Sequence, residues 1–377
     1  MSKKYLFIIA FSTIMVFSAL YAPQPLLPVI AKDFNVTKDA ASLLITVTLI
    51  PLALAPLFYG YILEKFSAKV VISLSFTILA LSEVVVYFTH NFTLFLLIRL
   101  LNGLVLPAIL TGLMTYISIS TSKENVQRVM AFYIASTIVG GFSGRLVSGF
   151  ISTYFGWRYV FLFLFFTLLI SLLLILQLEK DDRLNVSKLK LDMAKNILKK
   201  KEFLFCYLTI FFTFFVFAGF LNILPFRMFT VSSKVTEFKT GIMYSGYMLG
   251  VLISLNNVKI LKKLNNSAKL LVIIGLTIYL VSLFVMSFNS VVLLFLGMFL
   301  FCGGMFTVHS TLSGYLNRLA MENKGVVNGL YVSFYYTGGS IGSYLAVYIY
   351  RHFGWFVVLF FLAAMILFAN LFVKQCS

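Results

Sequence analysis

The sequence predicts an all-α membrane protein with twelve transmembrane helices arranged as two six-helix halves. Three observations lead to this prediction: the composition, the spacing of the apolar runs, and a repeat within the chain. Of the 377 residues, 61% are hydrophobic and only 11% are charged, whereas soluble domains are about half apolar and about a quarter charged. The composition excludes a soluble enzyme, a disordered chain and a nucleic-acid-binding domain, even though the net charge is +18.

The apolar runs have the length that a membrane helix needs. A bilayer core about 30 Å thick is crossed by about 20 apolar residues in a helix. We expect spans at 5–30, 41–63, 70–89, 93–118, 129–152, 158–178, 203–229, 240–261, 269–288, 290–316, 326–350 and 355–373. The division between the ninth and tenth runs is the least distinct of these. Short alternating segments, which are typical of a membrane β-barrel, do not occur.

The basic residues predict the orientation of the spans. With a cytoplasmic N-terminus, 21 of the 30 Lys and Arg residues fall in cytoplasmic segments and seven in outer segments, while Arg99 and Arg145 fall within spans. Because basic loops stay on the cytoplasmic side, we expect both termini to be cytoplasmic. Lys3 and Lys4 before an apolar stretch also resemble a signal peptide, but its removal would leave eleven spans and reverse the favourable orientation.

A repeat relates the two halves. The two tryptophans of the chain, Trp157 and Trp355, lie 198 residues apart, and this offset aligns 133–145 with 331–343 without gaps. The fifth and eleventh spans are therefore copies. We expect an N-terminal half at 1–178, a basic cytoplasmic linker at 179–202 and a C-terminal half at 203–377. In parallel repeats of this kind, the substrate binds between the halves near the midplane.

Five motifs fall in order on these spans. They are YAPQPLLP at 21–28, GYILEKFSAK at 60–69, RLLNG at 99–103, GGFSGR at 140–145 and NILPFR at 222–227. With them the whole chain resembles a major facilitator superfamily transporter. It is most similar to the drug:proton antiporter-like efflux members, the bacterial inner-membrane group related to arabinose-efflux permeases. In the motif at 60–69, Glu64 stands where the family usually has Asp, and Ser67 and Ala68 depart from its Gly and Arg.

The resemblance implies a transporter that works by alternating access between its two halves. The loop motif, with Gly60, Glu64, Lys65 and Lys69, is implied to hold the outward-open state. Lys65 and Lys69 also suit simple retention of positive charge on the cytoplasmic side. Small residues at helical spacing allow close backbone approach, so we expect helix packing, and closure of the outer side, at a set of glycines. These are Gly140, Gly141, Gly144, Gly338, Gly339 and Gly342.

An ionisable residue within a span costs free energy, so each one is a candidate for a functional role. Glu83 is the single acid in the predicted spans; it lies eight residues before Asn91, and Arg99 lies eight residues after it. At 1.5 Å per residue both lie about 12 Å from the tip of the hairpin, so we expect them to pair. The pair is either a static tie between two helices or a site where Glu83 carries a proton. Asp33, at the outer end of the first span, and His309 are the other candidates for proton coupling.

Arg145 has no charged counterpart in the second half, because its repeat partner is Ser343. It either contacts the substrate or a gate, or extends to the outer interface by snorkelling. Together with Arg99 it would favour a substrate with an anionic or carbonyl-rich end.

Further polar and aromatic residues are candidates for the wall of a substrate cavity. Gln24 lies between prolines that free backbone carbonyls, and the alternative is that it fills a backbone vacancy. His309 and Tyr335 suit a cavity or ordinary bundle packing. The full cavity prediction is Gln24, Arg99, Asn102, Arg145, Asn222, His309 and Tyr335.

The linker at 179–202 places Leu189, Met193 and Ile197 at helical spacing among lysines. This pattern predicts an amphipathic helix on anionic lipid. We expect no nucleic-acid partner and a monomeric protein.

The function that these observations favour is a proton-coupled efflux antiporter in a bacterial inner membrane. Its substrates would be small amphipathic organic compounds or sugar-like metabolites, and protons would be the second partner. A facilitator, or a symporter that imports a metabolite, is the alternative. The chain has no phosphate-binding GxxxxGK[ST] loop, which excludes a pump driven by ATP. We expect no enzyme activity, no cofactor and no metal, because the chain has no cluster of His, Cys and acidic residues.

Overall fold

The computed structural model describes residues 3–121, 125–179, 191–320 and 324–374, and all the regular elements in these ranges are helical. The first group of helices is α1 (Lys3–Tyr21), η1 (Gln24–Leu26), α2 (Leu27–Asp33), α3 (Lys38–Lys65), α4 (Ala68–Phe88), α5 (Phe92–Ser120), α6 (Val126–Phe155) and α7 (Arg158–Leu176). The second group is α8 (Leu191–Leu198), α9 (Lys201–Val231), α10 (Glu237–Met243), η2 (Tyr244–Gly246), α11 (Tyr247–Lys263), α12 (Ala268–Met286), α13 (Val291–Leu319) and α14 (Lys324–Lys374).

These elements make up the twelve predicted spans. Ten helices in the described ranges are long and apolar enough to cross a membrane. One of them, α14, joins two spans across the non-helical Gly354, and α10, η2 and α11 together form one further span. The predicted all-α fold is therefore confirmed, including the division between α12 and α13.

Polar residues in the loops start several of the helices. The side chains of Thr37, Ser67 and Asn91 accept hydrogen bonds from the free backbone N–H groups at the starts of α3, α4 and α5. Ser267 and Ser290 do the same for α12 and α13. A capping side chain satisfies donors that have no partner within the helix, so these residues mark where the chain re-enters a span.

The first span is interrupted where the prolines cluster. Pro23 has no N–H to donate to the carbonyl of Ala19, one turn earlier, and the helix continues as the short turn η1 and then α2. Pro225 leaves α9 continuous, but it likewise removes the N–H partner of the carbonyl of Leu221. Both carbonyls are bonded by side chains that matter for the site described below.

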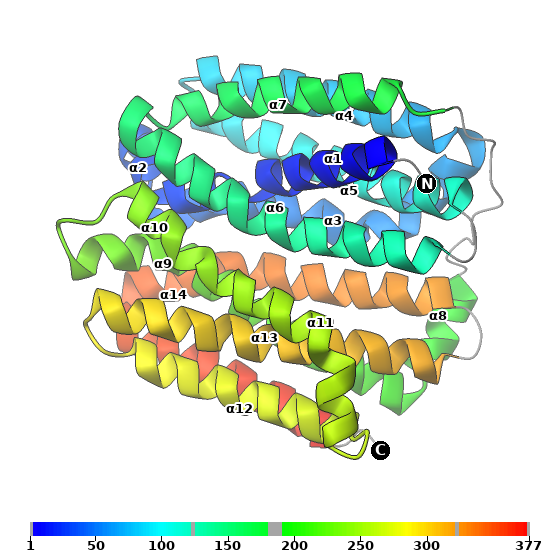
Figure 1. Ribbon diagram of the computed structural model, residues 1–377. Helices are drawn as coiled ribbons and strands as arrows, with labels where there is room; N and C mark the ends of the chain where they lie inside the picture. Colours follow the sequence, from blue (N-terminus) through cyan, green and yellow to red (C-terminus); the bar gives the residue numbers. More distant parts are fainter. Residues whose placement is uncertain (1–2, 122–124, 180–190, 321–323, 375–377) are drawn as a thin grey trace.

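The chain folds as two groups of helices side by side. Figure 1 shows α1–α7 in one group and α9–α14 in the other, with the N- and C-termini at the same end of the bundle. We refer to this end as the terminal end and to the other as the opposite end. Between the groups, α3 packs on α14, and α6 packs on α10 and α11. We call the groups the first half and the second half.

The repeat is visible in the backbone. Gly156 and Gly354 are separated by the repeat offset of 198, and both have positive φ, +104° and +84°. Side chains rarely adopt this left-handed region, which glycine enters without cost. Each glycine ends a span directly before a tryptophan, Trp157 or Trp355.

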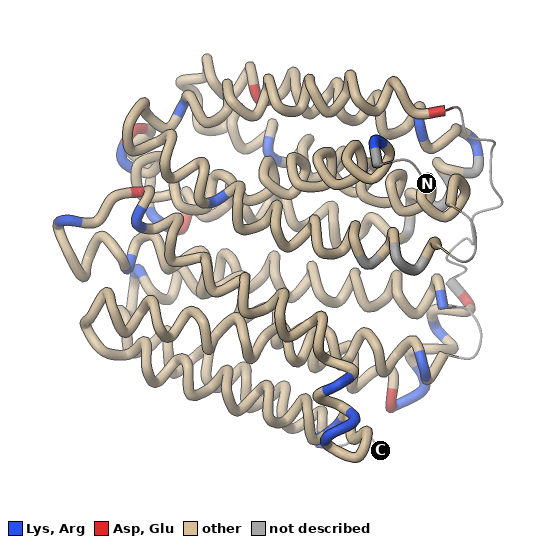
Figure 2. Tube along the Cα trace, in the orientation of Figure 1, with Lys and Arg blue, Asp and Glu red and all other residues tan. Residues whose placement is uncertain are grey.

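Apolar side chains cover the outside of the bundle, and charges lie mostly at its ends. Phe88, Phe284 and Phe360 are 68%, 68% and 76% exposed on peripheral helices. Figure 2 shows Lys, Arg, Asp and Glu gathered at the two ends, with isolated charged positions between them. A surface of this kind suits a bilayer and not water.

Candidate substrate site and gate

A chain of buried polar side chains crosses the interface between the halves. Arg145 of α6 donates from Nε to Oε1 of Gln24 at 2.6 Å, and Gln24 Nε2 donates to Oδ1 of Asn222 at 2.5 Å. Asn222 then donates to the backbone carbonyl of Ser343 at 3.1 Å. The hydroxyl of Ser343 lies 2.7 Å from that of Thr46 in α3. Four of the five side chains are at most 1% exposed, and Thr46 is 7% exposed.

The chain follows the repeat. Gln24 and Asn222 are 198 residues apart, as are Arg145 and Ser343. Equivalent residues of two repeats meet where the axis that relates the repeats passes between them. The predicted cavity residues Gln24, Arg145 and Asn222 are thus brought together on this axis, between the two halves.

Arg145 is enclosed by aromatic rings from both halves. Its Cζ atom lies 4.1 Å from the ring centre of Tyr21, 4.9 Å from that of Tyr244 and 5.0 Å from that of Tyr247. The hydroxyl of Tyr244 donates to the carbonyl of Leu221 at 3.1 Å, which is the carbonyl that Pro225 leaves without an N–H partner. The proline therefore fixes the direction of this ring.

The guanidinium of Arg145 does not snorkel to the nearest interface. Its Nη1 donates to the carbonyl of Gly141, one turn back along α6 toward the terminal end, at 2.5 Å. Helix side chains lean toward the N-terminus of their helix, and here that direction leads into the bundle. Nη2 is buried and has no hydrogen-bond partner among the described residues.

Arg99 lies inside the first half, where its side chain bonds backbone carbonyls of the interrupted first span. Its guanidinium donates to the carbonyls of Ala19, Leu20 and Leu44 at 3.1, 2.8 and 3.1 Å. Pro23 leaves the Ala19 carbonyl without its helical donor. The side chain is fully buried, and its donors are directed at backbone and not at a cavity.

The prediction of an ion pair between Glu83 and Arg99 is wrong. Among the described residues Glu83 forms no ion pair; Oε1 accepts a hydrogen bond from Asn102 at 3.2 Å, and Oε2 has no partner. Asn102 in turn accepts from the hydroxyl of Ser82 at 2.7 Å. Equal depth on neighbouring helices does not fix the direction of two side chains, and the guanidinium of Arg99 turns to the carbonyls of α1 and α3.

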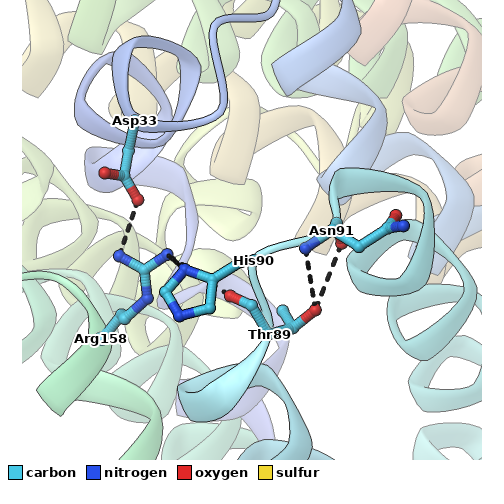
Figure 3. Close-up of polar contacts among 5 residues, drawn as sticks. All are labelled: Asp33, Thr89, His90, Asn91 and Arg158. Carbon is cyan, nitrogen blue, oxygen red and sulfur yellow. Dashed lines mark hydrogen bonds and ion pairs between the residues drawn. The ribbon is translucent and has the colours of Figure 1, made fainter.

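Asp33 belongs to a separate cluster at the opposite end. Its carboxylate pairs with Arg158 at 2.7 Å, and the Arg158 guanidinium lies 3.4 Å from both the Thr89 carbonyl and the ring nitrogen of His90. Figure 3 shows these side chains joining the end of the first span to the α4–α5 hairpin and the start of α7. The Asp33 side chain is 39% exposed, so Glu83 is the more enclosed of the two carboxyl groups.

His309 and Tyr335 lie in an aromatic cluster of the second half. The His309 ring nitrogen Nδ1 lies 2.8 Å from the hydroxyl of Tyr331, and the rings of His309 and Tyr335 are 5.1 Å apart. Tyr335 stacks on Phe214 of α9 at 3.5 Å. His309 and Tyr335 are partly exposed, whereas Phe214 forms the wall behind them.

At the opposite end, charged and small residues hold the halves together. Arg351 pairs with Asp39 at 2.7 Å, across the contact of α14 with α3. A Cβ atom at Gly149 would lie 2.3 Å from the carbonyl of Glu237, and one at Gly241 would lie 2.8 Å from that of Arg145. These glycines let α6 and α10 approach to backbone contact.

The glycines chosen from the repeat lie mainly within the halves. A Cβ atom at Gly140 or Gly144 would lie within 3 Å of the α1 backbone, and one at Gly338 or Gly342 within 3 Å of the α9 backbone. Gly339 faces the Phe214 ring, and a Cβ atom at Gly141 would lie 3.5 Å from Arg145 Nη1.

The loop motif lies at the terminal end. Lys69 donates to the carbonyl of Leu176 at 2.9 Å, which ties the start of α4 to the end of α7. Lys65 is exposed. The environments of Gly60 and Glu64 fall outside what the structure describes. Of the linker at 179–202, residues 180–190, with Leu189, also lie outside it.

The described part of the linker forms a short helix. In α8, Ala194 and Ile197 are buried, and the helix packs on α9 and α14. Lys195 in α8 and Lys199 directly after it are exposed. The apolar face of α8 thus contacts protein, and its exposed face carries Asp192 as well as Lys195.

Sequence reasoning missed the ring cage and the Asp39–Arg351 pair. Tyr21 stands within the first-span motif, but Tyr244 and Tyr247 come from a span without a motif. The offset of 198 aligns Tyr244 with Thr46. This repeat equivalence was the sequence signal available for Tyr244. No local pattern relates Asp39 to a partner 312 residues away.

The comparisons with known proteins agree with this architecture. The sequence model described as Major Facilitator Superfamily matches residues 7–343. An uncharacterized transporter of Buchnera aphidicola is 27% identical over 94% of this chain and 87% of its own length. Quinolone resistance protein NorA of Staphylococcus aureus is 27% identical over 37% of each chain.

Among solved structures, a bacterial homologue of the human lysosomal transporter Spinster, in an inward-facing conformation, superposes with a TM-score of 0.80. It is 14% identical and covers 100% of this chain and 98% of its own. At that identity the likeness concerns the fold. The family match spans most of the chain, and the twelve spans and the repeat agree with it: this multi-pass membrane protein belongs to the Major Facilitator Superfamily.

Proposed function

We propose that this transporter is a proton-coupled efflux antiporter for small amphipathic organic compounds, and that its terminal end faces the cytoplasm of a bacterium. The Lys and Arg residues in the loops at the terminal end support this orientation. Similarity to a quinolone resistance protein over about a third of the chain supports export. The observation that carries the proposal is the set of contacts between the halves.

These contacts favour closure of the outer side. The Asp39–Arg351 pair, the Gly149–Glu237 contact and the Thr46–Ser343 hydrogen bond all join the halves in the part of the interface nearer the opposite end. A structure held there takes up its substrate from the terminal end. Alternating access then requires these contacts to break when the substrate leaves.

Glu83 is the proposed proton site. An unpaired carboxylate that is removed from water costs far more free energy than a neutral carboxylic acid. Glu83 is fully buried and forms no ion pair among the described residues. It would therefore be protonated here and lose its proton when the rearranged helices admit water. Complete burial of Glu83 also separates its carboxyl group from water, and this observation favours the second candidate, a facilitator.

The test is transport by the purified protein in proteoliposomes. A panel of neutral, cationic and anionic amphipathic compounds is loaded, and a pH gradient is imposed in either direction. The proposal predicts that at least one compound accumulates against its gradient, in the direction opposite to proton flow. Equilibration at a rate independent of the pH gradient would identify a facilitator instead.

A further inference from the structure

Arg145 is a buried cation that lacks an anion. Among the described residues its guanidinium contacts only neutral groups: the Gln24 amide, the Gly141 carbonyl and three tyrosine rings. A fully desolvated charge is normally paired or bonded through all of its donors. Here one donor, Nη2, is buried without a partner.

We propose that Arg145 binds the carboxylate of the transported compound, and that the substrates are therefore organic anions with an aromatic or apolar body. This inference rests on the proposed transport function and specifies its substrate class.

The geometry of the guanidinium favours a carboxylate. Nε and Nη2 form one edge of the planar group, and two parallel donors on such an edge match the two oxygens of a carboxylate. Nε donates to the single side-chain oxygen of Gln24, and Nη2, beside it, has no acceptor in the described part of the chain. A carboxylate that takes the place of the Gln24 oxygen would use both donors and neutralise the charge.

The three tyrosines prepare this edge for binding. Rings within 5.0 Å of Cζ hold the guanidinium plane through cation–π contacts and exclude water. Tyr21 belongs to the first half and is partly exposed, whereas Tyr244 and Tyr247 belong to the second half. The cage is thus complete only while the halves are together, and it opens when they separate.

An aromatic path leads away from the cage toward the terminal end. The ring centres of Tyr247 and Phe217 are 5.6 Å apart, and those of Phe217 and Phe214 are 6.0 Å apart. Phe214 stacks on Tyr335 with a distance of 3.5 Å between ring centres. The ring of His309 continues the path at 5.1 Å from Tyr335. A planar apolar body attached to the carboxylate would lie against Tyr335 and His309, the partly exposed rings of this path.

Binding of a carboxylate to Arg145 would weaken the contact between the halves. Gln24 bonds Arg145 through its oxygen and Asn222 through its nitrogen. A carboxylate that displaces the Gln24 oxygen frees the side chain that joins the two repeats. Substrate binding and loosening of the interface are therefore one event.

The probes for the test are benzoate, phenylacetate and 2-naphthoate, each with its uncharged primary amide. Transport in proteoliposomes and thermal stabilisation of the purified protein are measured for each pair. A hydrogen bond to a charged group contributes about 1.5–3 kcal/mol, so at least one carboxylate should exceed its amide by about tenfold or more. In Arg145→Gln the preference should vanish, and in Arg145→Lys, which lacks the two-donor edge, it should be reduced.

Gln24→Glu is the second variant. Its carboxylate would occupy the Nε–Nη2 edge, so the protein should melt at a higher temperature and lose the response to added carboxylates. Equal effects of carboxylates and amides on the unmodified protein, or an unchanged preference in Arg145→Gln, would overturn the inference. Proton-driven transport of neutral compounds alone would overturn it and leave the proposed function intact. Carboxylate-specific stabilisation without proton-driven transport would support it and overturn the proposed coupling.

Discussion

Gln24 and Asn222, which are equivalent residues of the two repeats, hydrogen-bond to each other across the interface between the halves. Each also holds a residue of its own half: Gln24 accepts from Arg145, and Asn222 donates to the Ser343 carbonyl. The pair therefore connects α6 to α14 through the first and seventh spans. If the halves rock against each other, this connection has to break.

Replacing Asn222 should weaken closure of the opposite end. In Asn222→Ala the Gln24 amide and the Ser343 carbonyl lose a buried partner, and each such loss costs about 1–3 kcal/mol in the closed form. The open form, where water reaches both groups, loses less. We expect a cysteine at position 343, in a chain without its native cysteines, to react about tenfold faster with a membrane-impermeant maleimide.

The control for this change is Thr277→Ala, because Thr277 is exposed and its hydroxyl donates to the carbonyl of Ile273 in its own helix. An unchanged labelling rate in Asn222→Ala would argue against a closing role for the pair.

Arg99 should matter for folding more than for substrate choice. Arg99→Ala leaves the carbonyls of Ala19, Leu20 and Leu44 without this donor in a fully buried position. We expect a loss of several kcal/mol, seen as poor expression and a lower melting temperature, since each unsatisfied group costs about 1–3 kcal/mol. Arg158→Ala, at a partly exposed ion pair, is the comparison and should cost about 1 kcal/mol or less. Normal stability with altered substrate preference in Arg99→Ala would show that Arg99 faces the substrate instead.

Glu83→Gln should leave assembly of the protein intact and abolish coupling of transport to protons. The amide keeps the size of the side chain and can still bond Asn102, so the protein should fold and bind its substrate. It carries no titratable proton, so export driven by a pH gradient should be abolished while exchange of substrate for substrate continues. Asp33→Asn is the matched control and should retain the driven transport. Unchanged pH-driven export in Glu83→Gln would exclude Glu83 as the carrier.

Gly149 should be intolerant of a side chain. A Cβ atom there would lie 2.3 Å from the Glu237 carbonyl, so Gly149→Ala forces α6 away from α10 and hinders closure of the opposite end. Transport should fall by about tenfold or more. Gly314→Ala is the matched control, because a Cβ atom at Gly314 meets nothing within 4 Å, and the change favours the helix by up to about 1 kcal/mol. Equal transport by the two variants would contradict the close-approach argument.

Span positions and the repeat were predictable from the sequence, because both depend on patterns along the chain. The length of each apolar run is set by the bilayer, and the offset of 198 aligned residues such as Gly156 and Gly354 that share one backbone conformation. The offset also identified Arg145 as the charge without a copy in the second half.

Side-chain direction was not predictable in the same way. Glu83 and Arg99 were expected to pair from their depth, but the Ala19 carbonyl that Pro23 leaves free competes for the guanidinium. The cage around Arg145 needs rings from α1, η2 and α11, and the Asp39–Arg351 pair joins two helices that only the folded interface brings together. Contacts between halves follow from how the repeats dock, which no local pattern records.

The most direct test of alternating access through this interface is a reversible cross-link between Thr46 and Ser343. Their hydroxyl oxygens are 2.7 Å apart across the two halves, so a Thr46→Cys and Ser343→Cys pair should form a disulfide on oxidation. We predict that transport in proteoliposomes stops when the disulfide forms and returns on reduction, while either single variant is insensitive to oxidant. Full transport by protein whose disulfide has been verified by mass spectrometry would contradict it.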